Sequence, residues 1–136
     1  MAISYQIDSE LGIVRTQWSG KTTKEEMIQH WSTLLHHQEA RTCGRSLVEL
    51  GDSYPDFNFD GLSYFVHTSI QPHHLTRKWR TAVIARTPFQ YGAAMQYQVI
   101  AEKFIDIQVF TNEASAVVWI TSENNNDTRL CNEGDV

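Results

Sequence analysis

Residues 79–103 read WRTAVIARTPFQYGAAMQYQVIAEK, and this stretch decides the fold. Its apolar run, Ala82–Ala85, is unbroken, which is typical of a strand covered on both faces within a parallel sheet. Thr87, Pro88 and Gln90 then form a helix start, because threonine caps, proline suits the first helical position and glutamine completes a capping box. The helix is expected to run to the end of the stretch. A strand followed directly by a helix is the repeating unit of α/β proteins.

The rest of the chain continues this alternation. Two segments with alternating apolar residues, 3–7 and 13–18, predict an antiparallel hairpin. The further elements expected are a helix starting at Thr22 or Thr23 and fading near Glu39, a strand at 47–50, a loop at 53–60, a helix at 60–69, a strand at 105–109 and a short helix capped by Asn112. The predicted fold class is α/β: a small single-sheet sandwich in which an N-terminal β-hairpin precedes alternating strands and helices, with helices packed on a mixed sheet.

Length and composition predict one domain. The chain has 136 residues, of which 41% are hydrophobic, and residues 1–120 carry the regular patterns. Residues 121–136 have no period and few apolar residues, so we expect a disordered polar tail. The formal charge is −5, of which −3 lies in residues 121–136, so nucleic acid is excluded as a partner less by net charge than by the absence of a basic face larger than residues 77–80. No stretch predicts a transmembrane helix or a secretory signal, and two cysteines are too few for a disulfide scaffold, so we expect a cytoplasmic protein.

The last third of the chain resembles a known family. The residues that carry the resemblance are Arg80–Ala85, Tyr91-Gly92, Val109–Ala114 and Trp119-Ile120. They are similar, in this order, to the AVV strand, the YG helix start, the VF strand and the EA…WL helix of the SpoIIAA-like branch of the STAS/SEC14 superfamily. Trp18–Thr22 and Leu47–Leu50 match the G-x-[TS] start of the first helix and the LVDL strand of that branch, so the resemblance covers residues 3–120.

This resemblance implies a sheet with packed helices and offers two precedents for function. STAS domains are regulatory protein-binding modules, some of them switched by serine phosphorylation, whereas SEC14-type domains enclose a lipid or another apolar ligand. The phosphorylated serine lies in a turn that matches Asn58–Leu62 here, where Asp60 stands in place of the hydroxyl residue. An aspartate cannot accept phosphate through that chemistry, which argues against a kinase switch. Asp60 is instead expected to cap the following helix.

Motifs for nucleophilic catalysis and for metal binding are missing from the sequence. It contains no G-x-S-x-G elbow, no P-loop and no G-x-G-x-x-G. His30 and His37 share a helix face but lack a further ligand, and Cys43 lacks a neighbouring base. The basic run at 77–80 is expected to be a solvated loop. We therefore expect a protein without catalytic residues, metal or cofactor.

Two loops rich in aromatic residues form the candidate binding site. Ligands of open α/β sheets bind at the carboxyl ends of parallel strands, where the loops after the third and fourth strands are expected to emerge together. Their rings would supply apolar walls and their charged residues polar anchors. The candidate residues are Asp52, Tyr54, Phe57, Phe59, Asp60, Arg86, Phe89 and Tyr91. Alternatively, the same rings cover the end of the sheet or form a dimer contact.

Three classes of function follow from these residues. The leading hypothesis is a non-enzymatic regulatory or binding module that engages a protein partner or a small apolar, lipid-like ligand through the two loops. The second is an enzyme that uses Asp52, Asp60, Arg86 or a histidine for acid–base chemistry. The third is a structural module that forms a homodimer through its exposed rings.

Overall fold

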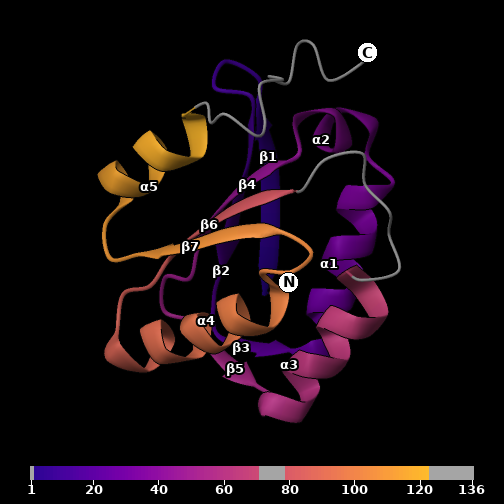
Figure 1. Cartoon of the computed structure of the whole chain (residues 1–136), viewed down its shortest axis with the longest axis vertical. Coiled ribbons are helices and arrows are strands. Elements are labelled where there is room, and N and C mark those ends of the chain that lie inside the picture. Colours follow the sequence, from indigo (N-terminus) through magenta and orange to yellow (C-terminus); the bar gives the residue numbers. More distant parts are fainter. Residues whose placement is uncertain (1, 71–78, 123–136) are drawn as a thin grey trace.

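A five-stranded mixed sheet forms the centre of the computed structural model, which describes residues 2–70 and 79–122 (Figure 1). The strands lie side by side in the order β1 (Ile3–Asp8), β2 (Ile13–Trp18), β4 (Arg45–Glu49), β6 (Arg80–Ile84) and β7 (Asp106–Phe110). β1 and β2 form the predicted antiparallel hairpin, and every later pair of neighbours is parallel. The α/β class with a mixed sheet is confirmed.

β6 is the strand that the unbroken apolar run predicts. It pairs with β4 on one side and with β7 on the other, and all five of its residues are buried. The helix that follows, α4 (Pro88–Ala101), begins where the capping residues place it, with the Thr87 side chain accepting a hydrogen bond from the Gln90 backbone N–H at 3.1 Å. The stretch from Trp79 onward therefore folds as predicted, except that α4 ends two residues early and that the Gln90 side chain accepts from the Arg86 N–H instead of completing a capping box with Thr87.

α1 (Lys24–Leu35) starts at a complete capping box. The Thr23 hydroxyl accepts from the Glu26 backbone N–H at 3.1 Å, and the Glu26 carboxylate accepts from the Thr23 N–H at 2.9 Å. These bonds hold the Glu26 carboxylate ionised, so its pKa lies below its ordinary value. The helix ends earlier than predicted, because His36 and His37 break it and His37 caps a separate helix, α2 (Gln38–Cys43).

The segment predicted as a loop at 53–60 contains a strand. β5 (Tyr54–Asp56) pairs in parallel with β3 (Lys21–Thr23) in a small second sheet of two strands. The next helix, α3 (Phe59–Phe65), continues into a π-helix, η1 (Val66–Ile70). Asp60 does not cap α3 as expected, because the Asn58 side chain accepts from the Gly61 N–H at 2.9 Å and the helix begins one residue earlier.

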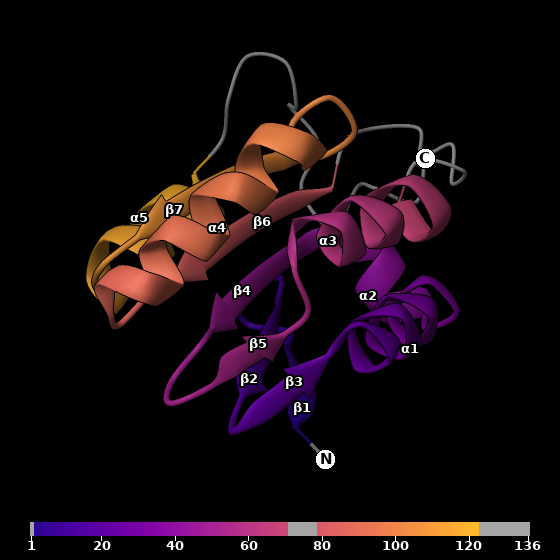
Figure 2. The same ribbon diagram turned by 90° about the horizontal axis from the view of Figure 1, so that it is seen from below.

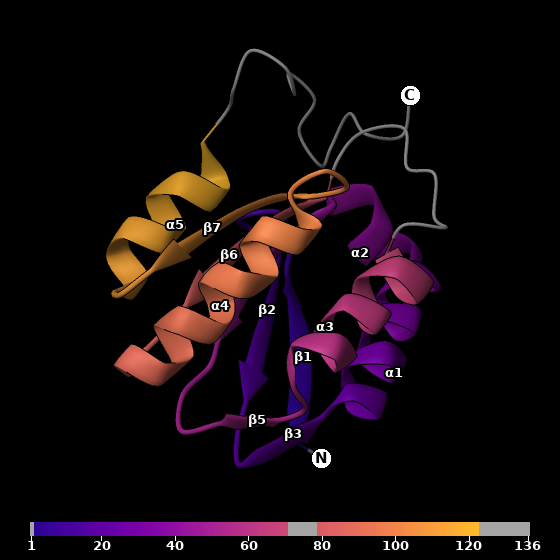
Figure 3. The ribbon, with the colours of Figure 1, turned by 60° about the horizontal axis from the view of Figure 1, so that its bottom comes forward.

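The two faces of the sheet are covered by different helices. α1, α3 and α4 lie next to one another over one face, which we call the three-helix face (Figures 2 and 3). The last helix, α5 (Glu113–Thr121), packs on β4, β6 and β7 from the other side, which we call the α5 face. Alternate strand residues serve the two faces, since Val48 and Val83 belong to the core under the three helices, whereas Leu47 and Ala82 pack with α5.

Two buried arginines hold the end of α5. The Arg45 guanidinium donates to the Ile120 carbonyl at 2.9 Å, and that of Arg80 donates to the Ser122 carbonyl at 2.6 Å while lying over the Trp119 ring. The expectation of a solvated basic run is therefore wrong for Arg80, which is 2% exposed. The rest of that run, 77–78, and the predicted tail beyond Ser122 lie outside the described residues.

Candidate functional site

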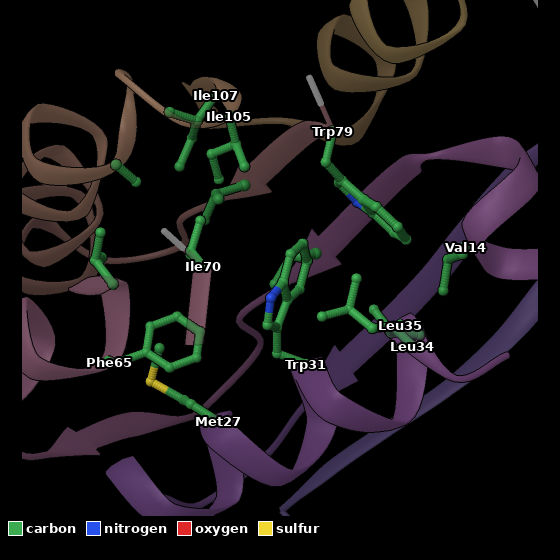
Figure 4. Close-up of a cluster of buried hydrophobic side chains, with 14 of the residues drawn as sticks. Val14, Met27, Trp31, Leu34, Leu35, Phe65, Ile70, Trp79, Ile105 and Ile107 are labelled. Atoms are coloured by element: carbon green, nitrogen blue, oxygen red, sulfur yellow. The ribbon is translucent and has the colours of Figure 1, made fainter. Parts of the chain in front are cut away.

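An apolar cavity of about 490 Å³ lies between the sheet and the three-helix face. The sheet contributes Val48 and Val83 to its walls, α1 contributes Trp31, α3 contributes Phe65, and α4 contributes Ala94. Figure 4 shows part of this core, with Met27, Trp31 and Phe65 projecting from their helices into the layer above the sheet. The cavity therefore has its inner wall in the main core of the protein and opens to solvent at the exposed residues Phe59 and Phe89.

The described walls of the cavity carry no charge at neutral pH. Among the described residues that line it, there is no aspartate, glutamate, lysine or arginine. Its two ionisable side chains are His30 and Tyr97. Burial lowers the pKa of His30 from 6.5 to about 4 and raises the pKa of Tyr97 above its ordinary value, so both stay neutral. The site is suited to an uncharged, apolar molecule.

Gln90 joins the two loops that the sequence places at the carboxyl ends of β4 and β6. Its side chain is 4% exposed and donates to the carbonyls of Gly51 at 3.0 Å and Ser53 at 2.8 Å, while its own carbonyl accepts from the Arg86 N–H at 2.6 Å. The sequence identifies Gln90 only as part of a helix cap. In the structure it also fixes the loop after β4 against the start of α4, beside the cavity that it lines.

Arg86 and Glu49 form an ion pair across the same two strand ends. The Arg86 Nε donates to the Glu49 carboxylate at 3.0 Å, and the Gly51 N–H donates to that carboxylate at 2.9 Å. Burial alone would raise the pKa of Glu49, but these donors outweigh it and the pKa is lowered. The same bond raises the pKa of Arg86. Arg86 is thus engaged outside the cavity.

Three of the predicted aromatic residues lie at the cavity. Phe57, Phe59 and Phe89 line it, and the last two also face solvent, with exposed fractions of 53% and 68%. They therefore form part of its rim. Tyr54 and Tyr91 are exposed and are not among the lining residues.

The predicted polar anchors lie elsewhere. Asp52 and Asp60 are exposed; Asp52 accepts from the Gly20 N–H at 3.2 Å, and Asp60 lies in the first turn of α3. Neither lines the cavity, and Arg86 does not line it either. The structure thus brings together the phenylalanines of the predicted site but not its charged residues.

Most of the wall that α1 contributes was not predicted as a site. Met27, Trp31 and Leu34 appear in the sequence as the apolar stripe of a helix, which indicates burial but not what the stripe covers. A filled core and a cavity wall use the same residue types, so no pattern in the sequence distinguishes them. His30, at the edge of this stripe, is the one polar residue of α1 that could have indicated the cavity from the sequence, and it lines the cavity.

In residues 2–70 and 79–122, no three histidine, cysteine, aspartate or glutamate side chains gather closely enough to hold a metal ion. Within the same residues, no helix combines the length and the hydropathy needed to cross a bilayer.

Together, the hairpin, the parallel strands and the packed helices form a SpoIIAA-like fold, as the order of the sequence motifs predicts. The chain is similar to the crystal structure of an uncharacterized protein of the DUF3478 family, with a SpoIIAA-like fold, from Shewanella loihica PV-4. The TM-score is 0.60 over 88% of this chain and 94% of that chain, with 16% sequence identity, which establishes the fold alone. No family model and no curated protein matches the sequence.

Proposed function

We propose that this protein is a non-enzymatic binding module that encloses a small apolar ligand between its sheet and the helices α1, α3 and α4. The cavity carries this proposal. Its volume of about 490 Å³ lies within the range of small-molecule sites, and its walls combine aromatic and aliphatic side chains with a few uncharged polar groups.

Phe59 and Phe89 support a route into the cavity. They lie in the first turns of α3 and α4, line the cavity and are largely exposed to solvent. Exposed apolar side chains that form a contiguous patch are typical of a binding site. A ligand that enters between these two helix starts would contact both rings.

The exposed rings also favour a second role, in which a protein partner or a second copy of the chain covers the rim. Tyr54, Phe59, Phe89 and Tyr91 are exposed and belong to the two loops and the helix starts that follow them. Light scattering separates a monomer from a homodimer. For a protein partner, we expect the variant with Phe57→Ala and Tyr91→Ala to lose capture of the partner that the wild type enriches.

A binding role fits the described residues better than acid–base catalysis. The charged residues proposed for catalysis, Asp52, Asp60 and Arg86, lie outside the cavity, and Arg86 is engaged by Glu49. His30 lines the cavity but is held neutral by burial, with a pKa of about 4. A general base for neutral pH needs a pKa much closer to that pH.

The test is a titration with the uncharged fluorescent probe N-phenyl-1-naphthylamine. We expect saturable binding with a rise in probe fluorescence, since the probe leaves water for an apolar site. Ala94→Leu inserts a larger side chain into the cavity wall and is expected to weaken binding by about fivefold or more.

The matched control is Ala114→Leu, the same change at an exposed position of α5. It should bind the probe as the wild type does. Equal binding by Ala94→Leu and Ala114→Leu, or no saturable binding by the wild type, would contradict the proposed site.

A further inference from the structure

Trp31 carries a polar group that the cavity leaves without a partner. Its side chain is 6% exposed, and its indole N–H is buried without a hydrogen-bond acceptor among the described residues. The neighbouring Trp79 is different, because its indole N–H donates to the Ser46 hydroxyl at 2.9 Å. A buried N–H that loses water and gains no acceptor is destabilising, and such groups are rare in folded proteins.

The orientation of the Trp31 ring is fixed by its neighbour. The rings of Trp31 and Trp79 pack edge to face, with centroids 5.0 Å apart and planes at 67°. In Figure 4 the nitrogen-bearing edge of Trp31 is turned away from Trp79, toward the side where Met27 and Phe65 lie. Those two residues line the cavity together with Trp31. The unpartnered N–H therefore lies on the side of the ring where the cavity-lining residues Met27 and Phe65 stand.

The described residues that line the cavity disfavour a ligand that would bury a charged group there. No lysine, arginine, aspartate or glutamate is among the described lining residues, so neither a carboxylate nor an ammonium group would find a counter-charge there. The neutral His30 cannot supply one near neutral pH. Moving an ion out of water without a partner is far more costly than moving a carbonyl that accepts one hydrogen bond.

We propose that the ligand is an uncharged molecule with an apolar body and an acceptor oxygen, such as a ketone, ester or quinone carbonyl, which accepts the hydrogen bond of the Trp31 indole. This rests on the proposed binding function and adds the chemical class of the ligand. Trp18 also lines the cavity and carries another indole N–H with no acceptor in the described part of the chain.

The test uses three probes with the same carbon count: butylbenzene, butyrophenone and 4-phenylbutanoate. Each displaces N-phenyl-1-naphthylamine from the wild type and from Trp31→Phe. We expect Trp31→Phe to bind butyrophenone about fivefold more weakly and butylbenzene with little change, because only the ketone uses the N–H. The wild type should bind 4-phenylbutanoate at least about tenfold more weakly than butyrophenone at neutral pH.

The control variant is Trp119→Phe, which removes an indole from the α5 face and leaves the cavity intact. It should change none of the three affinities. A second measurement uses the wild type alone. In nitrogen-15 NMR spectra, butyrophenone should shift the signal of the Trp31 indole proton downfield, whereas butylbenzene should not.

The outcomes separate the two proposals. If none of the probes binds, the proposed function is overturned. If butylbenzene binds but Trp31→Phe weakens ketone and hydrocarbon equally, or the Trp31 indole proton responds alike to both, the hydrogen bond is overturned while the binding function stands. If 4-phenylbutanoate binds as tightly as butyrophenone, the uncharged class is overturned.

Discussion

The two faces of the sheet use alternate residues of the same strands but are covered in different ways. On the α5 face, one helix packs against the sheet and Ile13, Ala82, Ala116 and Ile120 have no exposed surface. On the three-helix face, three helices with larger aromatic side chains lie over the strands, and a cavity of about 490 Å³ lies between them.

The difference shows how a small domain combines stability with an apolar cavity. Protein interiors are normally close-packed, and an empty apolar volume costs free energy. The α5 face supplies tight packing with small residues such as Ala82 and Ala116, so the helix lies close to the sheet. The three-helix face instead places bulky side chains such as Trp31 and Phe65 around a volume that they do not fill.

The largest effect is expected from removing a side chain on the α5 face. Ile120→Ala should lower the free energy of unfolding by about 3 kcal/mol, because it opens a void in a site where the side chain is fully buried. Phe89→Ala, at the exposed rim of the cavity, should cost less than about 0.5 kcal/mol. Urea denaturation of both variants measures the difference, and equal losses would contradict the contrast between the faces.

Adding volume should also cost more on the α5 face than on the three-helix face. Ala116→Leu inserts atoms into the closely packed α5 face and should destabilise by about 2 kcal/mol, whereas Ala94→Leu adds the same atoms next to the cavity and should cost well under that. Thermal melts compare the two variants directly. A larger loss for Ala94→Leu than for Ala116→Leu would mean that the three-helix face is already filled.

Acidification should destabilise the three-helix face through His30. The unfolded histidine has a pKa near 6.5 and the folded one about 4, so between these pH values the unfolded chain binds the extra proton and stability falls as the pH falls. We expect about 1–2 kcal/mol of this loss to be absent in His30→Phe. His36→Phe, at an exposed position, is the control and should retain the wild-type pH dependence.

The smallest effect is a gain in stability at the cavity. A methyl group at Gly92, within α4, would meet no atom within 4 Å, so Gly92→Ala should stabilise by about 0.5–1 kcal/mol through the helix backbone. At Gly61 in α3, the same methyl would lie 3.1 Å from the Phe57 side chain. Gly61→Ala should therefore show less gain, and the reverse order in chemical denaturation would argue against an open cavity wall at α4.

The sequence predicts the regular part of the fold because its signals are local. Alternation defines the hairpin, and Thr87, Pro88 and Asn112 mark helix starts that the structure confirms. It does not predict the pairing of β3 with β5, because three-residue strands joined across more than thirty positions leave no periodic pattern. The break at His36 and His37 was also missed, because apolar spacing does not mark a helix end that a side-chain cap creates.

The candidate site is predictable only in part, for a similar reason. Phe57, Phe59 and Phe89 follow from the rule that ligands approach the ends of parallel strands. Whether Trp31 lines a cavity depends on the distance between α1 and α4 across the sheet. That distance is set by tertiary packing, so the sequence does not predict it. Asp52 and Asp60 were expected beside the rings because they are close in sequence, but they point to solvent.

The most direct test of the central claim is a crystal of the protein pressurised with xenon, which enters apolar cavities that water avoids. We expect xenon between α1, α3 and α4, in contact with Val48, Val83 and Ala94. Xenon that appears only elsewhere, or an interior between these helices that is filled by side chains, would contradict it.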